Sequence, residues 1–140
     1  MELIGPDGKG PKPNRLGTYE LVMCTCRPRN DQNENFRKVE GRINIILTSL
    51  ANYSFQTVIN PNETAELPGE NPSDTSYIVF DKFDTRGIPF EFKKYGLLLA
   101  VEVHKSELEY ARANGTAELI KKLRTAGVYP YSDIDRAPVL

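Results

Sequence analysis

The chain has 140 residues, of which 39% are hydrophobic and 26% charged, and its 18 lysines and arginines nearly balance 19 aspartates and glutamates. A chain of this size buries roughly two-thirds of its unfolded surface, so we expect one soluble globular domain. The formal charge of -1 leaves no basic field for nucleic acid or an anionic membrane, and we expect neither as a partner.

The sequence also lacks the signals of membrane insertion and secretion. Its longest apolar runs, such as Gly96–Val101, are far shorter than the roughly 20 residues that cross a bilayer. The first residues, Met1–Pro6, have neither the basic nor the apolar region of a signal peptide. Cys24 and Cys26 are too few for a disulfide scaffold, so we expect reduced, buried thiols that pack as small apolar residues. These features predict a cytoplasmic protein.

Glycines and prolines dominate the N-terminal residues, which predicts a flexible leader over residues 1–17 and a single domain over residues 18–140. The glycine-rich run Gly5–Gly10 lacks the spacing, the preceding strand and the following helix of a phosphate-binding loop. The alternating run Tyr19–Cys26 predicts a first strand that is buried on both faces.

A long helix is predicted next. Asp31, followed three residues later by Glu34, has the spacing of a helix N-cap with its reciprocal partner. Gly41 in the middle of the helix costs about 1 kcal/mol relative to alanine, which indicates either close packing against the sheet or simple tolerance. Apolar residues at intervals of three and four form the buried stripe: Phe36, Val39, Ile43, Ile46, Leu47 and Leu50.

The hydrophobic period then changes to two. This change predicts a second strand over Tyr53–Ile59, and Thr64–Leu67 is a short strand candidate before Pro68. An antiparallel meander, with a hairpin turn at Asp84–Gly87, is predicted for three further runs. These runs are Ser76–Phe83, Ile88–Tyr95 and Leu97–His104.

The C-terminal part predicts a pair of helices. Ser106 and Glu109 have the spacing of a capping box, which starts the first helix. Asn114-Gly115 tolerates positive φ and separates the two helices, and Ala126-Gly127 ends the second. The predicted fold class is therefore α+β, with a mixed, mostly antiparallel sheet, one long helix after the first strand and a C-terminal helix pair.

No pattern in the chain combines the residues that catalysis normally requires. Ser106 is explained as a helix cap, and a structural zinc site needs more ligands than Cys24, Cys26 and His104 supply. Glu102 and His104 share a strand face about 7 Å apart and form the one candidate titrating pair. We therefore expect no catalytic residue, no metal ligand and no cofactor.

Asp133, Asp135 and Arg136 form a polar cluster near the C-terminus. Two carboxylates beside an arginine more often form an ion pair or cap a turn than bind a cation. We expect Arg136 to donate two hydrogen bonds to a carboxylate and to pin the C-terminal segment to the sheet, while a partner-binding surface is the alternative. The structural role predicts a loss of about 1–3 kcal/mol of stability on Arg136→Ala.

Elimination of these chemistries leaves protein binding as the favoured function class. The short strand Thr64–Leu67, beside loops marked by proline, is a candidate sheet edge open to a strand of a partner protein.

Several segments also carry a family resemblance. Within Gly96–Gly115 an apolar strand enters a helix with the pattern E-x-x-Y/F-A-x-x-x-G, and Pro130–Arg136 has the pattern P-x-x-D-x-x-R. Upstream, Tyr19–Val22 and Ala51–Phe55 fit the same family. Over most of residues 18–140 the chain resembles the suppressor of fused domain family, and it looks like a short bacterial member.

The resemblance implies a non-enzymatic α+β domain that binds another protein. The animal member of the family holds a transcription factor in a cleft, with the ligand added as a strand, whereas many bacterial members look like immunity proteins that neutralise polymorphic toxins. The resemblance thus favours an antitoxin whose partner is a toxin domain. A regulatory binder of a transcription factor or another cytoplasmic protein is the alternative, and a small enzyme that uses His104 and Glu102 is a further one.

Overall fold

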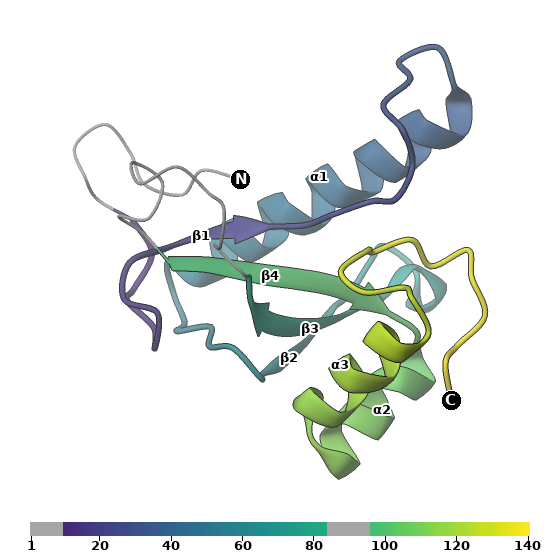
Figure 1. The fold of residues 1–140 in the computed structure, drawn as a ribbon. Coiled ribbons are helices and arrows are strands. Elements are labelled where there is room, and N and C mark those ends of the chain that lie inside the picture. The colour runs from purple at the N-terminus through teal and green to yellow at the C-terminus, as the bar shows by residue number, and fades with distance from the viewer. Residues whose placement is uncertain (1–9, 84–95) are drawn as a thin grey trace.

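A four-stranded mixed sheet forms the middle layer of the computed structural model, which describes residues 10–83 and 96–140 (Figure 1). The strand order is β1-β4-β3-β2. β1 runs parallel to β4, whereas β4 and β3, and β3 and β2, are antiparallel. The strands span Tyr19–Val22 (β1), Thr64–Leu67 (β2), Ser76–Lys82 (β3) and Gly96–Val103 (β4). This sheet confirms the predicted mixed, mostly antiparallel arrangement.

Helices cover both faces of the sheet, and the mixed sheet with one helix after β1 and two near the C-terminus confirms the predicted α+β class. The long helix α1, Glu34–Ser54, lies on one face, and its N-terminal end projects past the strands (Figure 1). The helix pair α2, Lys105–Asn114, and α3, Thr116–Thr125, lies on the other face. Gly115 joins the two with a φ of 100°, which is the positive-φ break that the sequence predicts.

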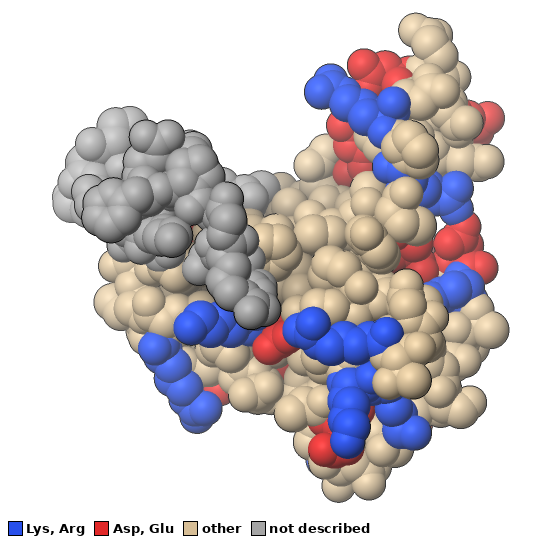
Figure 2. Space-filling view, viewed as in Figure 1, with Lys and Arg blue, Asp and Glu red and all other residues tan. Residues whose placement is uncertain are grey.

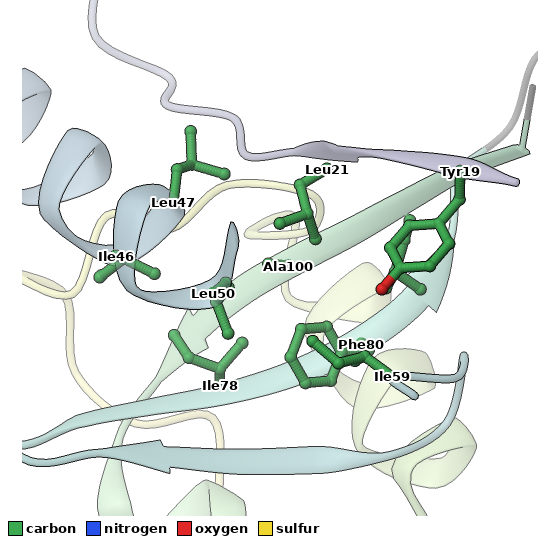
Figure 3. Close-up of a cluster of buried hydrophobic side chains, with 10 residues drawn as sticks. Tyr19, Leu21, Ile46, Leu47, Leu50, Ile59, Ile78, Phe80 and Ala100 are labelled. Atoms are coloured by element: carbon green, nitrogen blue, oxygen red, sulfur yellow. The ribbon is translucent and has the colours of Figure 1, made fainter. Parts of the chain in front are cut away.

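Side-chain alternation along the strands divides the core into two clusters. On the α1 face, Ile46, Leu47 and Leu50 pack against side chains of β1, β3 and β4, as Figure 3 shows. On the other face, residues of α2 and α3 pack against the intervening positions of the same strands. The predicted stripe of α1 is largely confirmed, because these three residues and Phe36 are buried while Val39 and Ile43 are half-buried.

The predicted starts of two helices are wrong. α1 is capped by Asn33 and not by Asp31, since the Asn33 side chain accepts hydrogen bonds from two backbone N–H groups of the first turn. α2 begins after His104, whose backbone N–H donates to Glu107 Oε2 at 2.9 Å, so Ser106 lies inside the helix and does not cap it. In both regions several polar residues have capping ability, and the course of the incoming chain selects among them.

The predicted strand over Tyr53–Ile59 is also wrong. α1 continues through Ser54, and hydrogen bonds from the N–H groups of Gln56 and Thr57 to Tyr53 O form the turn that follows. The alternation that suggested a strand comes from a helix end and a loop, in which Phe55 is exposed and Ile59 is buried. A period of two over so few residues does not distinguish these structures.

Two further strand predictions need correction. β1 ends at Val22, and beyond it only an isolated bridge joins Cys24 to Tyr131. β3 pairs directly with β4, so the predicted meander, in which another strand separates them, is wrong. The middle run Ile88–Tyr95 and the turn Asp84–Gly87 lie outside the described residues, as does Gly5–Gly10 except for its last residue.

Part of the predicted leader contacts the domain. Asn14 Nδ2 donates to Ile59 O at 2.6 Å, and the Arg15 N–H donates to Asn60 Oδ1 at 2.9 Å. Leu16 lies so close to Gly96 that a Cβ at residue 96 would fall 2.5 Å from that of Leu16. These contacts hold residues 14–16 against the α1–β2 loop and the start of β4.

None of the helices in residues 10–83 and 96–140 has the length and apolar character needed to span a membrane.

We expect Gly41→Ala to raise the free energy of unfolding by about 0.5–1 kcal/mol. No atom lies within 4 Å of a Cβ built at Gly41, so alanine contributes its helix propensity without a clash. Urea denaturation followed by circular dichroism measures the change. Gly115→Ala is the control and should destabilise, because φ at residue 115 is strained for a side chain. A lower stability of Gly41→Ala would contradict the prediction.

Candidate functional site

The outer edge of β2 pairs with no strand among the described residues. On its inner side, Ala65 and Leu67 are aligned with Ile78 and Ser76 of β3. The Phe80 N–H donates to Glu63 O just before β2. In an antiparallel pair, every second residue directs its N–H and C=O groups toward the neighbouring strand and the residues between direct theirs away. Counted from Glu63, the backbone groups of Thr64 and Glu66 therefore point away from β3. The edge therefore presents two N–H and two C=O groups to an incoming chain.

A groove of about 460 Å³ runs along this edge. One wall comes from the C-terminal end of α1 and the following loop, where Tyr53 is 46% and Val58 is 40% exposed. Arg112 of α2 lines the opposite side. The groove thus offers backbone hydrogen-bonding groups between exposed apolar side chains, which is the combination that binds extended peptide segments.

Arg112 also organises the α2 side of the edge. Its Nε donates to Thr64 Oγ1 at 3.2 Å, and its Nη1 donates to Glu66 Oε1 in an ion pair. Both β2 side chains point to this face, whereas Ala65 and Leu67 pack toward α1. A charged pair on an edge strand keeps the edge soluble while its backbone groups stay available.

The two residues of the predicted titrating pair do not contact each other. Glu102, 2% exposed, accepts hydrogen bonds from Arg42 Nε at 3.0 and 2.8 Å. His104 lies past the end of β4, and its Nε2 is 2.8 Å from Arg136 O. The predicted pair is therefore wrong, because each side chain is engaged by a different segment of the chain.

The C-terminal polar cluster joins separate parts of the fold. Arg136 donates from Nη1 and Nη2 to the two carboxylate oxygens of Glu107, at 2.8 and 2.9 Å. This confirms the predicted bidentate contact, but the carboxylate belongs to the first turn of α2 and not to the sheet. Asp133 accepts from Thr25 Oγ1 at 2.6 Å and from the Cys26 N–H at 2.8 Å.

Asp135 and the two cysteines complete this region. Asp135 forms an ion pair with Arg27. Both cysteines are free thiols, as predicted, but only Cys24 is half-buried, and its burial raises the pKa of the thiol. Cys26 is exposed, so the expectation of a buried pair is wrong for it. In the described parts of the chain, no group of three or more His, Cys, Asp and Glu residues is arranged to hold a metal ion.

A comparison with models of protein families identifies the family of this chain. The model described as suppressor of fused protein (SUFU) matches residues 10–137, which is nearly the whole chain. The chain belongs to the suppressor of fused family. Membership suggests a protein-binding domain. Comparisons with curated proteins and with solved structures found no match.

The closing pattern of this SUFU domain, P-x-x-D-x-x-R, holds the C-terminal segment at two points. Asp133 attaches it to the loop after β1, and Arg136 attaches it to α2. Just before Asp133, Ser132 Oγ accepts from the Glu102 N–H at 3.0 Å, which places the segment beside β4 where β1 has ended. These contacts support a structural role for the pattern.

Sequence reasoning identified the β2 edge but missed the walls of the groove. The predicted strand over Tyr53–Ile59 does not indicate that the side chains of Tyr53 and Val58 are exposed. Arg112 lies 48 residues from its partner Thr64, so no local pattern connects the two. The two aromatic residues Tyr53 and Phe55 close together were the available signal, because aromatic side chains are enriched at binding surfaces.

We expect Arg136→Ala to lower the free energy of unfolding by about 1–3 kcal/mol, because Glu107 is fully buried and loses its charged partner. Glu107 keeps hydrogen bonds from the His104 and Val139 N–H groups, which limits the loss. Chemical denaturation measures it. Arg29→Ala, which breaks an exposed pair with Asp31, is the matched control and should change stability by less than about 0.5 kcal/mol.

The same contact predicts a pH dependence. Burial raises the pKa of Glu107, but hydrogen bonds from Arg136, His104 and Val139 outweigh it and hold the pKa below its ordinary value. The stabilisation is therefore complete above the unfolded pKa of about 4.3 and is lost as the pH falls through the lower folded pKa. Denaturation midpoints measured below pH 5 should fall less steeply for Glu107→Gln than for the wild type. Parallel curves for the two proteins would contradict this assignment.

Proposed function

We propose that this SUFU domain binds a protein partner by accepting an extended segment of that partner at the edge of β2, and that it acts without catalysis. The observation that carries the proposal is the groove along this edge, with outward backbone groups at Thr64 and Glu66 and exposed Tyr53 and Val58 beside them. A partner strand gains main-chain hydrogen bonds from the edge and side-chain contacts from the walls.

The alternation of a strand suits the two sides of the groove. Side chains on one face of an added strand meet the α1 wall, where Tyr53 lies, and those on the other face meet Arg112 and Glu66. The first side favours apolar residues and the second favours polar or charged ones. The groove thus favours a segment whose apolar and polar residues alternate.

The partner that we propose is a toxin domain, which the protein neutralises in the bacterial cytoplasm as an immunity protein. Support comes from the resemblance to bacterial members of the family and from the groove, which provides a surface for stable protein binding. A regulatory binder of a transcription factor or another cytoplasmic protein would use the same edge, so the identity of the bound protein separates the two.

Glu102 and His104 also bear on the proposal that the domain is not an enzyme. The Glu102 carboxylate is buried against Arg42, and the ring of His104 is hydrogen-bonded to the C-terminal segment. These contacts account for both side chains structurally. They support a binding function without using either residue in a reaction.

The edge is tested with Glu66→Pro, because proline removes an N–H that points away from β3 and leaves the β2–β3 hydrogen bonds intact. Tagged wild-type protein is purified from its source lysate, and we expect a toxin domain at a near one-to-one ratio. Glu66→Pro should lose it. Glu66→Ala, which keeps the N–H but removes the ion pair with Arg112, is the matched control and should retain it. Retention by a folded Glu66→Pro variant would overturn the edge as the binding site.

The enzyme alternative has its own test. We expect His104→Gln and Glu102→Gln to protect cells that express the toxin domain as well as the wild type does, at equal soluble levels. Loss of protection by a folded, toxin-binding variant would instead support catalysis by one of these residues.

A further inference from the structure

The glycine in the middle of α1 has no structural explanation. A Cβ at Gly41 would meet no atom within 4 Å, and the residue has helical backbone angles that any amino acid adopts. Close packing, one of the two explanations that the sequence allowed, is therefore excluded. Simple tolerance is the other explanation, and residues that break a local propensity without a packing reason also occur at functional positions.

Gly41 lies at a surface hollow of about 790 Å³. The hollow separates the N-terminal half of α1 from the loop between β2 and β3, where Pro68 and Asp74 line it. Ile45, one turn after Gly41, is 70% exposed and is the most exposed large apolar residue in the described parts of the chain. Because Gly41 has no side chain, the hollow leaves the apolar side chain of Ile45 exposed, while charged side chains line its rim.

The hollow continues the groove at the β2 edge. Pro68 lines both, and α1 provides a wall of both, with Tyr53 at one end and Gly41 at the other. The 12 residues from Gly41 to Tyr53 span about 18 Å of helix. An extended chain covers this distance with five to six residues at about 3.3 Å each. One segment along β2 therefore reaches both positions.

The charges around the hollow do not favour a charged side chain of a partner protein. Arg37, Lys38 and Arg42 line it together with Glu70 and Asp74, so both signs are present. Arg42 is already bonded to Glu102, and Asp74 accepts a hydrogen bond from Asn71 Nδ2 at 3.0 Å. In Figure 2 the projecting end of the molecule likewise carries lysine or arginine next to acidic residues. The feature of the hollow that lacks a contact among the described residues is the exposed apolar surface of Ile45.

We propose that the Gly41 hollow receives one large apolar side chain, of leucine size or aromatic, from the same partner segment that pairs with β2. This residue lies six positions from the one that packs on Tyr53, because an even separation keeps both side chains on the α1 side of an extended segment. The inference rests on the proposed function and extends the binding site beyond the β2 edge. It assigns to Gly41 the role of leaving room for that side chain, as anchor pockets do at protein interfaces.

The test uses a phage library of random 12-residue peptides selected on the full-length wild-type protein. Enriched peptides are synthesised, and their affinities for variants are measured by fluorescence anisotropy. We expect two large apolar residues six positions apart. Gly41→Trp, which fills the hollow, should weaken binding at least tenfold. Asn44→Trp places the same side chain on an exposed α1 position that lines neither the β2 groove nor the Gly41 hollow, and should change affinity less than twofold.

The outcomes separate this inference from the proposed function. Peptides that lose affinity with Glu66→Pro but not with Gly41→Trp bind at β2 alone, and they overturn the inference while the edge site survives. Peptides insensitive to both variants, or a selection that enriches no peptide, also overturn the inference, and the toxin-binding experiment then decides the proposed function independently. Circular dichroism and thermal melting of each variant confirm that it is folded.

Discussion

The burial of β4 on both faces and along both edges is the constraint on which the rest of the structure depends. Its side chains alternate between the α1 cluster and the α2–α3 cluster, and every residue from Leu98 to Val103 is buried. Buried N–H and C=O groups must be paired, but β1 ends at Val22, opposite Leu99. Ser132 supplies the missing contacts, because its hydroxyl accepts from the Glu102 N–H and lies 3.5 Å from Ala100 O.

This requirement explains why the C-terminal segment is fixed so extensively. Asp133 and Arg136 hold the residues that follow Ser132's contact with β4, and the buried Glu107 carboxylate connects the segment to α2. The closing pattern of the family therefore maintains the central strand. Glu107 and Glu102 are the buried carboxylates of the part of the chain that the structure describes. Each has an arginine partner from a distant segment, which makes its burial tolerable.

The β2 edge of the sheet differs from the region around β4, because its backbone groups are exposed. β2 is short, carries the Glu66–Arg112 pair, and exposes its backbone groups in a groove whose α1 wall is apolar. Stability is concentrated around β4, whereas the exposed apolar residues Tyr53 and Ile45 lie along the β2 side of α1. A sheet with an accessible edge at β2 is a suitable platform for binding an extended segment.

Periodicity in the sequence determined α1, β2, β3 and β4, since each buries a continuous stripe or face whose spacing depends only on local geometry. The sequence also determined the edge candidate at Thr64–Leu67 and the bidentate contact of Arg136. Only the tertiary structure decided that Glu107 receives that arginine, that Asn33 caps α1, and that Tyr53 ends a helix and lines a groove. These outcomes depend on contacts between residues far apart in the chain or on competition among similar neighbours, and neither leaves a local pattern.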